Sequence, residues 1–237
     1  MSFLSRIFPP SRVTRLQTER EQWLRVPGLS YALKQLLEAP LPDFNATVTH
    51  LPWLVFDFET SGLDANTDCI LSIGSVVAEN GQIGLASAQH HYISSGNPVN
   101  ARSAIINHIT PEMLRDGVAL DKAMEALFTS LTGRVAVVHG RMVERAFINA
   151  WLFKRYGREG LPLLWIDTLE LERRHQQAAR RIQNDLRLSS IRRDYHLPDY
   201  PAHHALCDAV ATAEVLLAQI GARSHGHDLL LNAFLCD

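Results

Sequence analysis

The stretch Trp53-Leu54-Val55-Phe56-Asp57-Phe58-Glu59 decides the fold, and the turn signal Ser61-Gly62 closes it. A short apolar run that ends at a turn predicts a buried β-strand. Side chains at positions i and i+2 of a strand point to the same face, so we expect Asp57 and Glu59 to project together. Two adjacent anions repel each other unless a cation neutralises them, and Mg²⁺ and Mn²⁺ prefer oxygen ligands. The end of this strand therefore predicts a metal site.

Candidate partners for this site lie downstream. The segment 203–218 is rich in Ala and Leu, which predicts a helix that begins at His203 and carries Asp208. Glu144 follows an apolar run and a turn. Each residue has a structural alternative. His203 and Asp208 could be surface residues of the helix, and Glu144 could form a surface ion pair with Arg145.

Three ordered motifs give the chain a resemblance to one family. Asp57-Phe58-Glu59-Thr60-Ser61-Gly62 resembles the first motif of the DnaQ-like, DEDDh-type 3′–5′ exonucleases, which include the epsilon proofreading subunit of bacterial DNA polymerase III. Segments 138–148 and 203–213 resemble the second and third motifs. The second departs from the commonest pattern, because Glu144 stands where most members carry Asp. The resemblance extends from about Leu54 to Ala218 and implies a ribonuclease H-like α/β fold.

The resemblance also implies a metal-dependent 3′–5′ exonuclease that uses two Mg²⁺ or Mn²⁺ ions. Such a pair of ions activates the attacking water and stabilises the leaving oxygen of a phosphodiester. By the match to the family motifs, Asp57 would bridge both ions, with Glu59 and Asp208 completing the shells. Glu144 would act through water. His203 would be the general base, because an imidazole can take a proton at neutral pH.

Substrate contacts are implied by the same motifs. A backbone amide near Thr60 would meet the 3′-hydroxyl, and Leu63 would pack against the terminal base; the alternatives are a turn residue and a core residue. His139 either lines the site or only ends a strand. His204 is a rival for the role of general base, and the spacing of the third motif favours His203.

The predicted elements divide the chain into a helical N-terminal extension, residues 1–50, and an exonuclease domain, residues 51–237. In the extension, apolar spacing predicts helices over 16–24 and 29–37, followed by a proline-containing linker at 39–42. We expect these helices to pack on the main domain as a hairpin, with docking of a partner as the alternative.

In the main domain, three meandering strands precede alternating strands and helices, which is typical of a mixed α/β sheet flanked by helices. Asn80-Gly81 predicts a tight hairpin, and Thr110-Pro111 predicts a helix start. The expected strands are 53–59, 70–78, 83–93, 134–138 and 163–166, and the expected helices are 120–131, 144–156, 167–181, 189–195 and 203–218. We expect Asp167-Thr168 to cap a helix.

Composition sets broad limits. The 237 residues carry a net charge of −2, with 46% hydrophobic and 20% charged residues, which is ordinary for a globular protein. No apolar run is expected to span a bilayer, and three cysteines without a C-x-x-C pair argue against a disulfide framework. These features favour a cytoplasmic protein. Residues 134–193 hold 13 Lys and Arg against 6 Asp and Glu, either as a solvated helix face or as a flank that contacts phosphates.

Three functions are compatible with these patterns. The first is hydrolysis of single-stranded or frayed DNA from a free 3′ end, in repair, proofreading or nucleotide turnover. The second is trimming of short RNA, which contacts to the 2′-hydroxyl would decide. The third is a non-catalytic domain that binds nucleic acid or a polymerase, and the complete acidic set with His203 argues against it. Association with a DNA polymerase subunit and the oligomeric state stay open.

Overall fold

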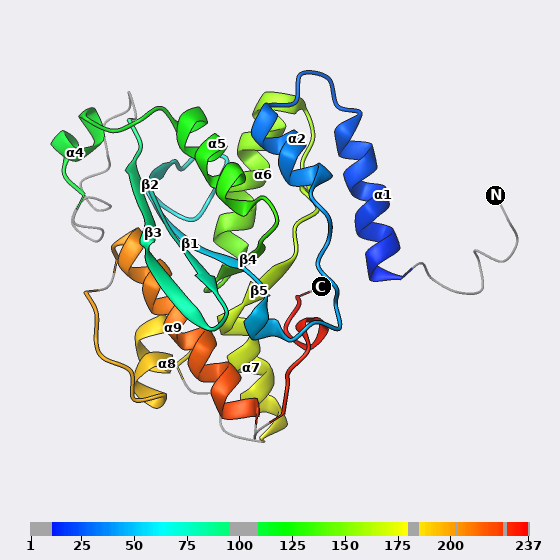
Figure 1. Ribbon diagram of the computed structural model, residues 1–237. Coiled ribbons are helices and arrows are strands. Elements are labelled where there is room, and N and C mark those ends of the chain that lie inside the picture. The colour runs from blue at the N-terminus through cyan, green and yellow to red at the C-terminus, as the bar shows by residue number, and fades with distance from the viewer. Residues whose placement is uncertain (1–10, 95–108, 180–184, 202, 225–226, 237) are drawn as a thin grey trace, which may run out of the picture.

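The structure is a computed structural model that describes residues 11–94, 109–179, 185–201, 203–224 and 227–236. Its centre is a five-stranded sheet in the order β3-β2-β1-β4-β5 (Figure 1). The first three strands meander antiparallel, and β4 pairs parallel with both β1 and β5, which confirms the expected mixed sheet. The strands are β1 Trp53–Thr60, β2 Ile70–Glu79, β3 Gln82–Tyr92, β4 Val135–Val138 and β5 Trp165–Asp167.

Helices cover both faces of this sheet (Figure 1). One apolar cluster joins α2, α5 and α6 to one face, and a second joins α7 and α9 to the other. The helices are α1 Arg12–Leu24, α2 Tyr31–Glu38, α4 Pro111–Arg115, α5 Leu120–Leu131, α6 Met142–Tyr156, α7 Thr168–Ala178, α8 Leu188–Asp194 and α9 Ala205–Ser224, with short 3₁₀ turns at Val48–His50 and Leu231–Ala233.

Two local signals in the sequence are confirmed. Asn80 and Gly81 join β2 to β3 with φ angles of 52° and 71°, the left-handed conformation that a type I′ hairpin turn requires at both positions. Thr110 caps α4 by accepting a hydrogen bond from the Met113 amide, and Pro111 is the first helical residue. Each signal involves residues that are adjacent in the chain, so the turn and the cap can form without tertiary contacts.

Some expected boundaries differ from the structure. β5 begins at Trp165 rather than at 163, because its pairing with β4 starts there. α9 begins at Ala205 rather than at His203, because His203 has a φ of 64°, and this left-handed conformation cannot continue into a right-handed helix. α9 also continues to Ser224, past the expected end. The end expected for α7, at residue 181, lies outside the described residues.

The alternation along β1 decides which side chains meet which layer. Its even-numbered side chains pack with α2, α5 and α6. The odd-numbered Trp53 and Val55 pack in the cluster that contains α9. Asp57 and Glu59 continue the odd-numbered set, so the period of the strand carries both carboxylates to the side of the sheet that α9 covers.

The first turn of α9 lies unusually close to β2. Gly74, the β2 residue paired with Asp57, has no room for a side chain. A Cβ added to Gly74 would lie 2.1 Å from the amide nitrogen of Leu206 and 2.2 Å from the carbonyl carbon of Ala205. The helix also presents buried small residues at four-residue intervals, namely Ala205, Ala209 and Ala213. Small residues on both surfaces therefore bring the start of α9 against the strand next to Asp57.

The N-terminal helices pack on the main domain, as expected. Trp23 of α1 and Leu33 of α2 are fully buried in one apolar cluster with Phe128 and Leu131 of α5. The indole nitrogen of Trp23 also donates a hydrogen bond to the carbonyl oxygen of Gly160, at 3.0 Å. The extension thus contributes to the core, and the division of the chain at residue 50 stays a prediction.

The expectation that no segment is apolar and long enough to cross a membrane needs correction. Among the described residues, α9 meets that test with 20 residues and a mean hydropathy of 1.4, but half of the apolar window is buried inside the structure. Its alanine face packs on the sheet. Burial of this kind is the ordinary environment of a core helix.

We expect Gly74→Ala to lower the thermal stability of the chain and Gly84→Ala to change it little. The new methyl group at Gly74 would overlap the backbone of α9, whereas a Cβ at Gly84 would lie 3.4 Å from the Val77 carbonyl oxygen and 3.8 Å from the Ser87 hydroxyl oxygen, which are ordinary contact distances. Overpacking of this kind costs about 1–3 kcal/mol. Thermal unfolding of the two variants measures the difference, and equal midpoints would contradict the close approach of α9.

Candidate active site

Three carboxylates converge where β1 ends and α9 begins. One oxygen from each of Asp57, Glu59 and Asp208 lies within 4.8 Å of the oxygens of the other two. The strand period brings the first two together, and the close approach of α9 over Gly74 adds the third. The predicted projection of Asp57 and Glu59 to one side is confirmed, and Asp208 is not a remote surface acid.

The backbone that immediately precedes α9 in the chain holds the Asp208 carboxylate in place. The amides of His203 and His204 donate to Oδ2 of Asp208, with N···O distances of 2.9 and 3.3 Å. A left-handed conformation costs a non-glycine residue about 1–3 kcal/mol, and at His203 these two hydrogen bonds offset that strain. The five-residue offset between His203 and Asp208 thus belongs to a turn that the carboxylate stabilises.

Glu144 reaches the same centre from α6. Asp167 holds the turn that enters this helix, because its two carboxylate oxygens accept the amides of Gly140 at 2.8 Å and Arg141 at 3.0 Å. Glu144 follows in the first turn of α6 with 3% of its surface exposed, and its Oε2 has no partner among the described residues. Because Glu144 is buried, the alternative of a surface ion pair with Arg145 is excluded.

Burial raises the pKa values of all four carboxyl groups, and repulsion from neighbouring carboxylates adds to the effect for Asp57, Glu59 and Glu144. For Asp57, burial contributes most, the charges of the other three carboxylates add to it, and the pKa lies well above its ordinary value. Burial raises the pKa of Glu59 to about 8, with a further contribution from Asp208, and burial raises the pKa of Glu144 to about 8. Burial also raises the pKa of Asp208, although the two amide hydrogen bonds oppose it. The cluster therefore favours neutralisation by protons or by a cation.

Two adjoining hollows open onto the carboxylates. Their volumes are about 340 Å³ and 550 Å³, and Asp57, His139 and His203 line both. Thr60 and Leu63 line the smaller one, together with Glu59 and Glu144. Leu63 is 79% exposed, which excludes its alternative as a core residue.

His139 lines the site and also fixes its wall. Nδ1 lies 2.8 Å from the hydroxyl oxygen of Thr168, and Nε2 lies 3.0 Å from the carbonyl oxygen of Leu186. Burial lowers the pKa of His139, and the charge of Asp167 opposes that effect. With both nitrogens engaged, His139 connects the end of β4 to α7 and to the chain segment before α8.

The two neighbouring histidines differ in their surroundings. His203 is exposed and lines both hollows. The ring of His204 packs against the ring of His90, with centroids 4.5 Å apart, and its Nδ1 accepts a hydrogen bond from the Cys207 amide at 3.4 Å. His203 is therefore the histidine that faces the space above the carboxylates.

The sequence did not point to the far wall of the larger hollow. Asp185, Arg187 and Tyr200 contribute to it from the segments that flank α8. The predicted capping of α7 by Asp167 is confirmed, but its second role in holding the start of α6 was missed. An acid at a strand end was the sole available signal for that role.

Some arginines of the basic segment 134–193 have partners in the structure. Arg192 is buried and pairs with Glu214 at 2.7 Å, and Arg173 pairs with Glu170 at 2.6 Å. These arginines have structural partners inside the protein. Arg180 and Arg181 lie outside the described residues. For the rest of the segment, a solvated helix face and a flank that contacts phosphates both stay open.

Comparison with known proteins gives one consistent family. Residues 54–216 match the RNase_T family, described as Exonuclease. The PolC-type DNA polymerase III of Thermotoga petrophila is 29% identical over 175 residues, which cover 74% of this chain and 12% of the relative. The PolC-type enzyme of Listeria welshimeri is 26% identical over 221 residues, which cover 89% of this chain and 15% of the relative. The chain thus spans about an eighth of the length of the curated relatives that it matches.

Solved structures share the fold. The nuclease domain of 3′hExo, a DEDDh family member bound to rAMP, superposes with a TM-score of 0.62 at 12% identity over 75% of this chain and 96% of that one. Exonuclease X in complex with 5′ overhanging duplex DNA gives a TM-score of 0.57 at 21% identity over 73% of this chain and 93% of that one. The expected ribonuclease H-like fold is confirmed.

We expect Mn²⁺ to raise the melting temperature more at about pH 8 than at about pH 5. The pKa values of Glu59 and Glu144 rise to about 8 in the folded chain, above those of an unfolded chain. The folded chain therefore holds protons that the unfolded chain has released, and metal-free stability falls as pH rises from about 4.5 to 8. A cation must displace the same protons, so its binding strengthens with pH. Thermal unfolding with and without Mn²⁺ measures both trends.

Glu144→Gln provides the control. It keeps the size of the side chain and removes its charge, so metal-free stability at about pH 8 should not fall, and the stabilisation by Mn²⁺ should shrink. An unchanged Mn²⁺ effect would place Glu144 outside the metal site. A Mn²⁺ effect that is larger at about pH 5 would contradict the linkage between proton release and metal binding.

Proposed function

The chain belongs to the RNase_T family of exonucleases, and on that premise we propose that it hydrolyses single-stranded DNA from the 3′ end with two Mg²⁺ or Mn²⁺ ions. The observation that carries this proposal is the convergence of Asp57, Glu59 and Asp208 within 4.8 Å, beneath two hollows. Nuclease chemistry follows from the family, whereas the direction, the substrate and the number of ions are the proposal.

The donor set fits divalent cations. Hard ions take carboxylate oxygens, and the unpartnered Oε2 of buried Glu144 adds a fourth acid beside the three that converge. The pKa values of Asp57 and Glu59 are raised first by burial and then by the charges of neighbouring carboxylates, and a bound cation would offset both effects. Asp57, Glu59 and Asp208 would hold the ions, with Glu144 acting through water. Bound ions would supply a nucleophilic water and neutralise the leaving oxygen.

The other residues bind the strand and move a proton. His203 stands exposed at the edge shared by both hollows, where its imidazole can accept the proton of the attacking water. Leu63, which is 79% exposed, offers an apolar surface to the terminal base, and the backbone near Thr60 lies beside it to receive the 3′-hydroxyl. His139 keeps the wall between the hollows in place through its two hydrogen bonds.

A polymerase partner and a cytoplasmic location are part of the same proposal. The relatives named above are PolC-type DNA polymerase III chains, and this chain matches about an eighth of their length. An exonuclease of this kind would act on frayed 3′ ends beside a polymerase or in repair. Short RNA is the alternative substrate, because one neighbouring structure holds rAMP.

End-labelled oligonucleotides test the proposal. DNA and RNA of one sequence, single-stranded or duplex, are incubated with Mg²⁺ or Mn²⁺ and sampled over time. We expect the 3′ label of single-stranded DNA to leave first as a mononucleotide, while the 5′-labelled strand shortens stepwise. Excess chelator or Asp57→Ala should stop cleavage without unfolding the chain.

Each component of the proposal can fail separately. Full activity in excess chelator would contradict the metal mechanism. Early loss of the 5′ label would contradict the direction, and faster degradation of RNA would make the chain an exoribonuclease. Tight oligonucleotide binding without cleavage under every metal condition would leave a non-catalytic binding domain.

We expect His203→Ala to lower the cleavage rate by about 10²–10⁴-fold, because general-base catalysis typically contributes that much. Metal binding should persist, because the carboxylates remain. His204→Ala is the matched control and should change the rate little, since that ring packs on His90 outside the hollows. Rates across pH at saturating Mn²⁺ separate the two variants. A large defect in His204→Ala beside a normal His203→Ala would reverse the assignment.

A further inference from the structure

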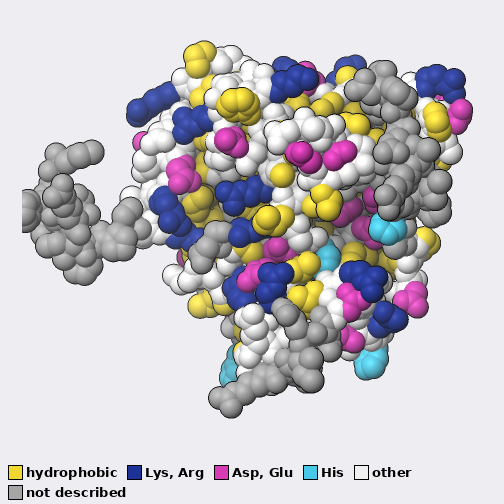
Figure 2. Space-filling model, turned by 180° about the vertical axis from the view of Figure 1, so that it is seen from behind, with side chains coloured by type: hydrophobic (Ala, Val, Ile, Leu, Met, Phe, Trp, Pro, Cys, Tyr) yellow, Lys and Arg dark blue, Asp and Glu magenta, His cyan; other side chains and the backbone are white. Residues whose placement is uncertain are grey.

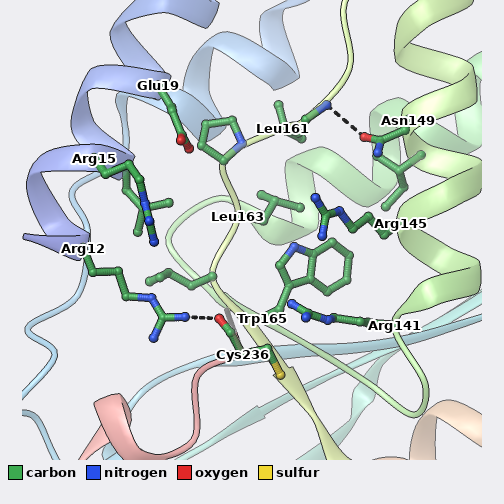
Figure 3. Close-up of a pocket in the computed structure, with 15 residues that line it drawn as sticks. Arg12, Arg15, Glu19, Arg141, Arg145, Asn149, Leu161, Leu163, Trp165 and Cys236 are labelled. Atoms are coloured by element: carbon green, nitrogen blue, oxygen red, sulfur yellow. Dashed lines mark hydrogen bonds between the residues drawn. The ribbon is translucent and has the colours of Figure 1, made fainter. Parts of the chain in front are cut away.

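A further pocket, apart from the two hollows above the carboxylates, lies between α1 of the N-terminal extension and α6 (Figure 3). Its volume is about 480 Å³, within the range of small-molecule sites. It shares no lining residue with the two hollows above the carboxylates. Figure 2 shows Lys and Arg side chains grouped on this side of the molecule. The nuclease proposal gives this pocket no role.

The charge of the pocket is strongly positive. Four arginines line it, with a single acid, Glu19. Arg15 reaches in from α1, Arg141 from the N-cap of α6 and Arg145 from the first turn of α6, and the four-residue spacing puts the last two on one side of the helix (Figure 3). Guanidinium groups that converge in this way repel one another and favour an anion between them.

These three arginines differ from others in the chain. Among the described residues, no ion pair or side-chain hydrogen bond involves the guanidinium of Arg15, Arg141 or Arg145. By contrast, Arg155, on the same helix, pairs with Asp121. Arg12, the fourth, donates to the carbonyl oxygen of Cys236 at the bottom of the pocket. Three guanidinium groups are therefore available to one ligand.

The wall between the α1 arginines and the α6 arginines is apolar. It is the chain segment that leads into β5, and Figure 3 shows the Trp165 ring between the side chains of Arg141 and Arg145. Leu161 and Leu163 extend this wall beyond the indole. A pocket with guanidinium groups on two sides of an apolar wall suits a ligand that has both a phosphate group and a flat or apolar body.

We propose that this pocket binds a small phosphate-bearing ligand of nucleotide size. Its phosphates lie among Arg15, Arg141 and Arg145, and its body rests on Leu163 and Trp165. Arginine favours this role because its planar fork donates two parallel hydrogen bonds to a phosphate. The site needs α1, so it gives the N-terminal extension a binding function in addition to its part in the core.

Calorimetric titration of the full chain in excess chelator tests this site, because without metal the carboxylates repel phosphate. The probes are ATP, inorganic tripolyphosphate and adenosine. We expect ATP to bind and adenosine not to bind. Binding of tripolyphosphate as tightly as ATP assigns the site to the phosphates alone, and tighter binding of ATP assigns it to a nucleotide.

Variants then locate the binding. Arg141→Ala and Arg145→Ala should each weaken ATP about 10-fold to 100-fold, as expected for a lost charged hydrogen bond. Arg145→Lys should recover part of the loss. Lys154→Ala removes an equal charge from an exposed position of α6 outside the pocket, and should change nothing.

Three results would overturn the proposal. The first is failure of both ATP and tripolyphosphate to bind, and the second is adenosine binding as tightly as ATP. The third is an effect of the arginine variants on single-stranded oligonucleotide binding with ATP binding unchanged, which would make the pocket part of a nucleic-acid path. Circular dichroism of each variant checks that its fold is intact.

Discussion

Electrostatic repulsion among four clustered carboxylates, the buried Glu59 and Glu144 and the half-buried Asp57 and Asp208, is the constraint on which the rest of this structure depends. Four acids in one place oppose folding unless protons or cations neutralise them. The raised pKa values of these groups express the same cost in terms of proton binding. The acids stay together because each belongs to an element whose position is fixed by contacts elsewhere.

Those contacts are of three kinds. β1 lies at the centre of the sheet, and the pairing of Asp57 with Gly74 and of Glu59 with Ser72 of β2 fixes the backbone that carries both acids. α9 is held by close backbone packing over Gly74, which only a glycine permits. α6 is held by the two hydrogen bonds from the turn that enters it to Asp167. Sheet pairing, small-residue packing and a buried cap thus each fix one part of the site.

The sequence predicted what depends on local pattern. The strand period of β1 paired Asp57 with Glu59, and the Asn80-Gly81 turn fixed the hairpin. The start of α9 was placed too early, because the left-handed turn at His203 depends on a carboxylate that folds back onto its amides. Periodicity contains no information of that kind.

Long-range contacts account for what the sequence left open. Spacing alone could not decide whether Glu144 was buried or paired with Arg145, because both lie on the same helical turn and only the sheet determines which one faces inward. The far wall of the larger hollow and the arginine pocket combine segments that are distant in the chain, so no window of sequence contains them.

α6 borders both the carboxylate site and the arginine pocket. The contacts that hold α6 in place therefore determine how far the two sites influence each other. Glu144 faces the carboxylates, while Arg141 and Arg145 face α1. A ligand among the arginines could shift the metal site only by moving the first turn of α6. That movement would break the hydrogen bonds to Asp167, which is itself buried and caps α7. The cost of leaving a buried carboxylate without its donors is about 1–3 kcal/mol or more. The anchor at Asp167 therefore favours two sites that bind independently, with the same helix as a rigid wall between them.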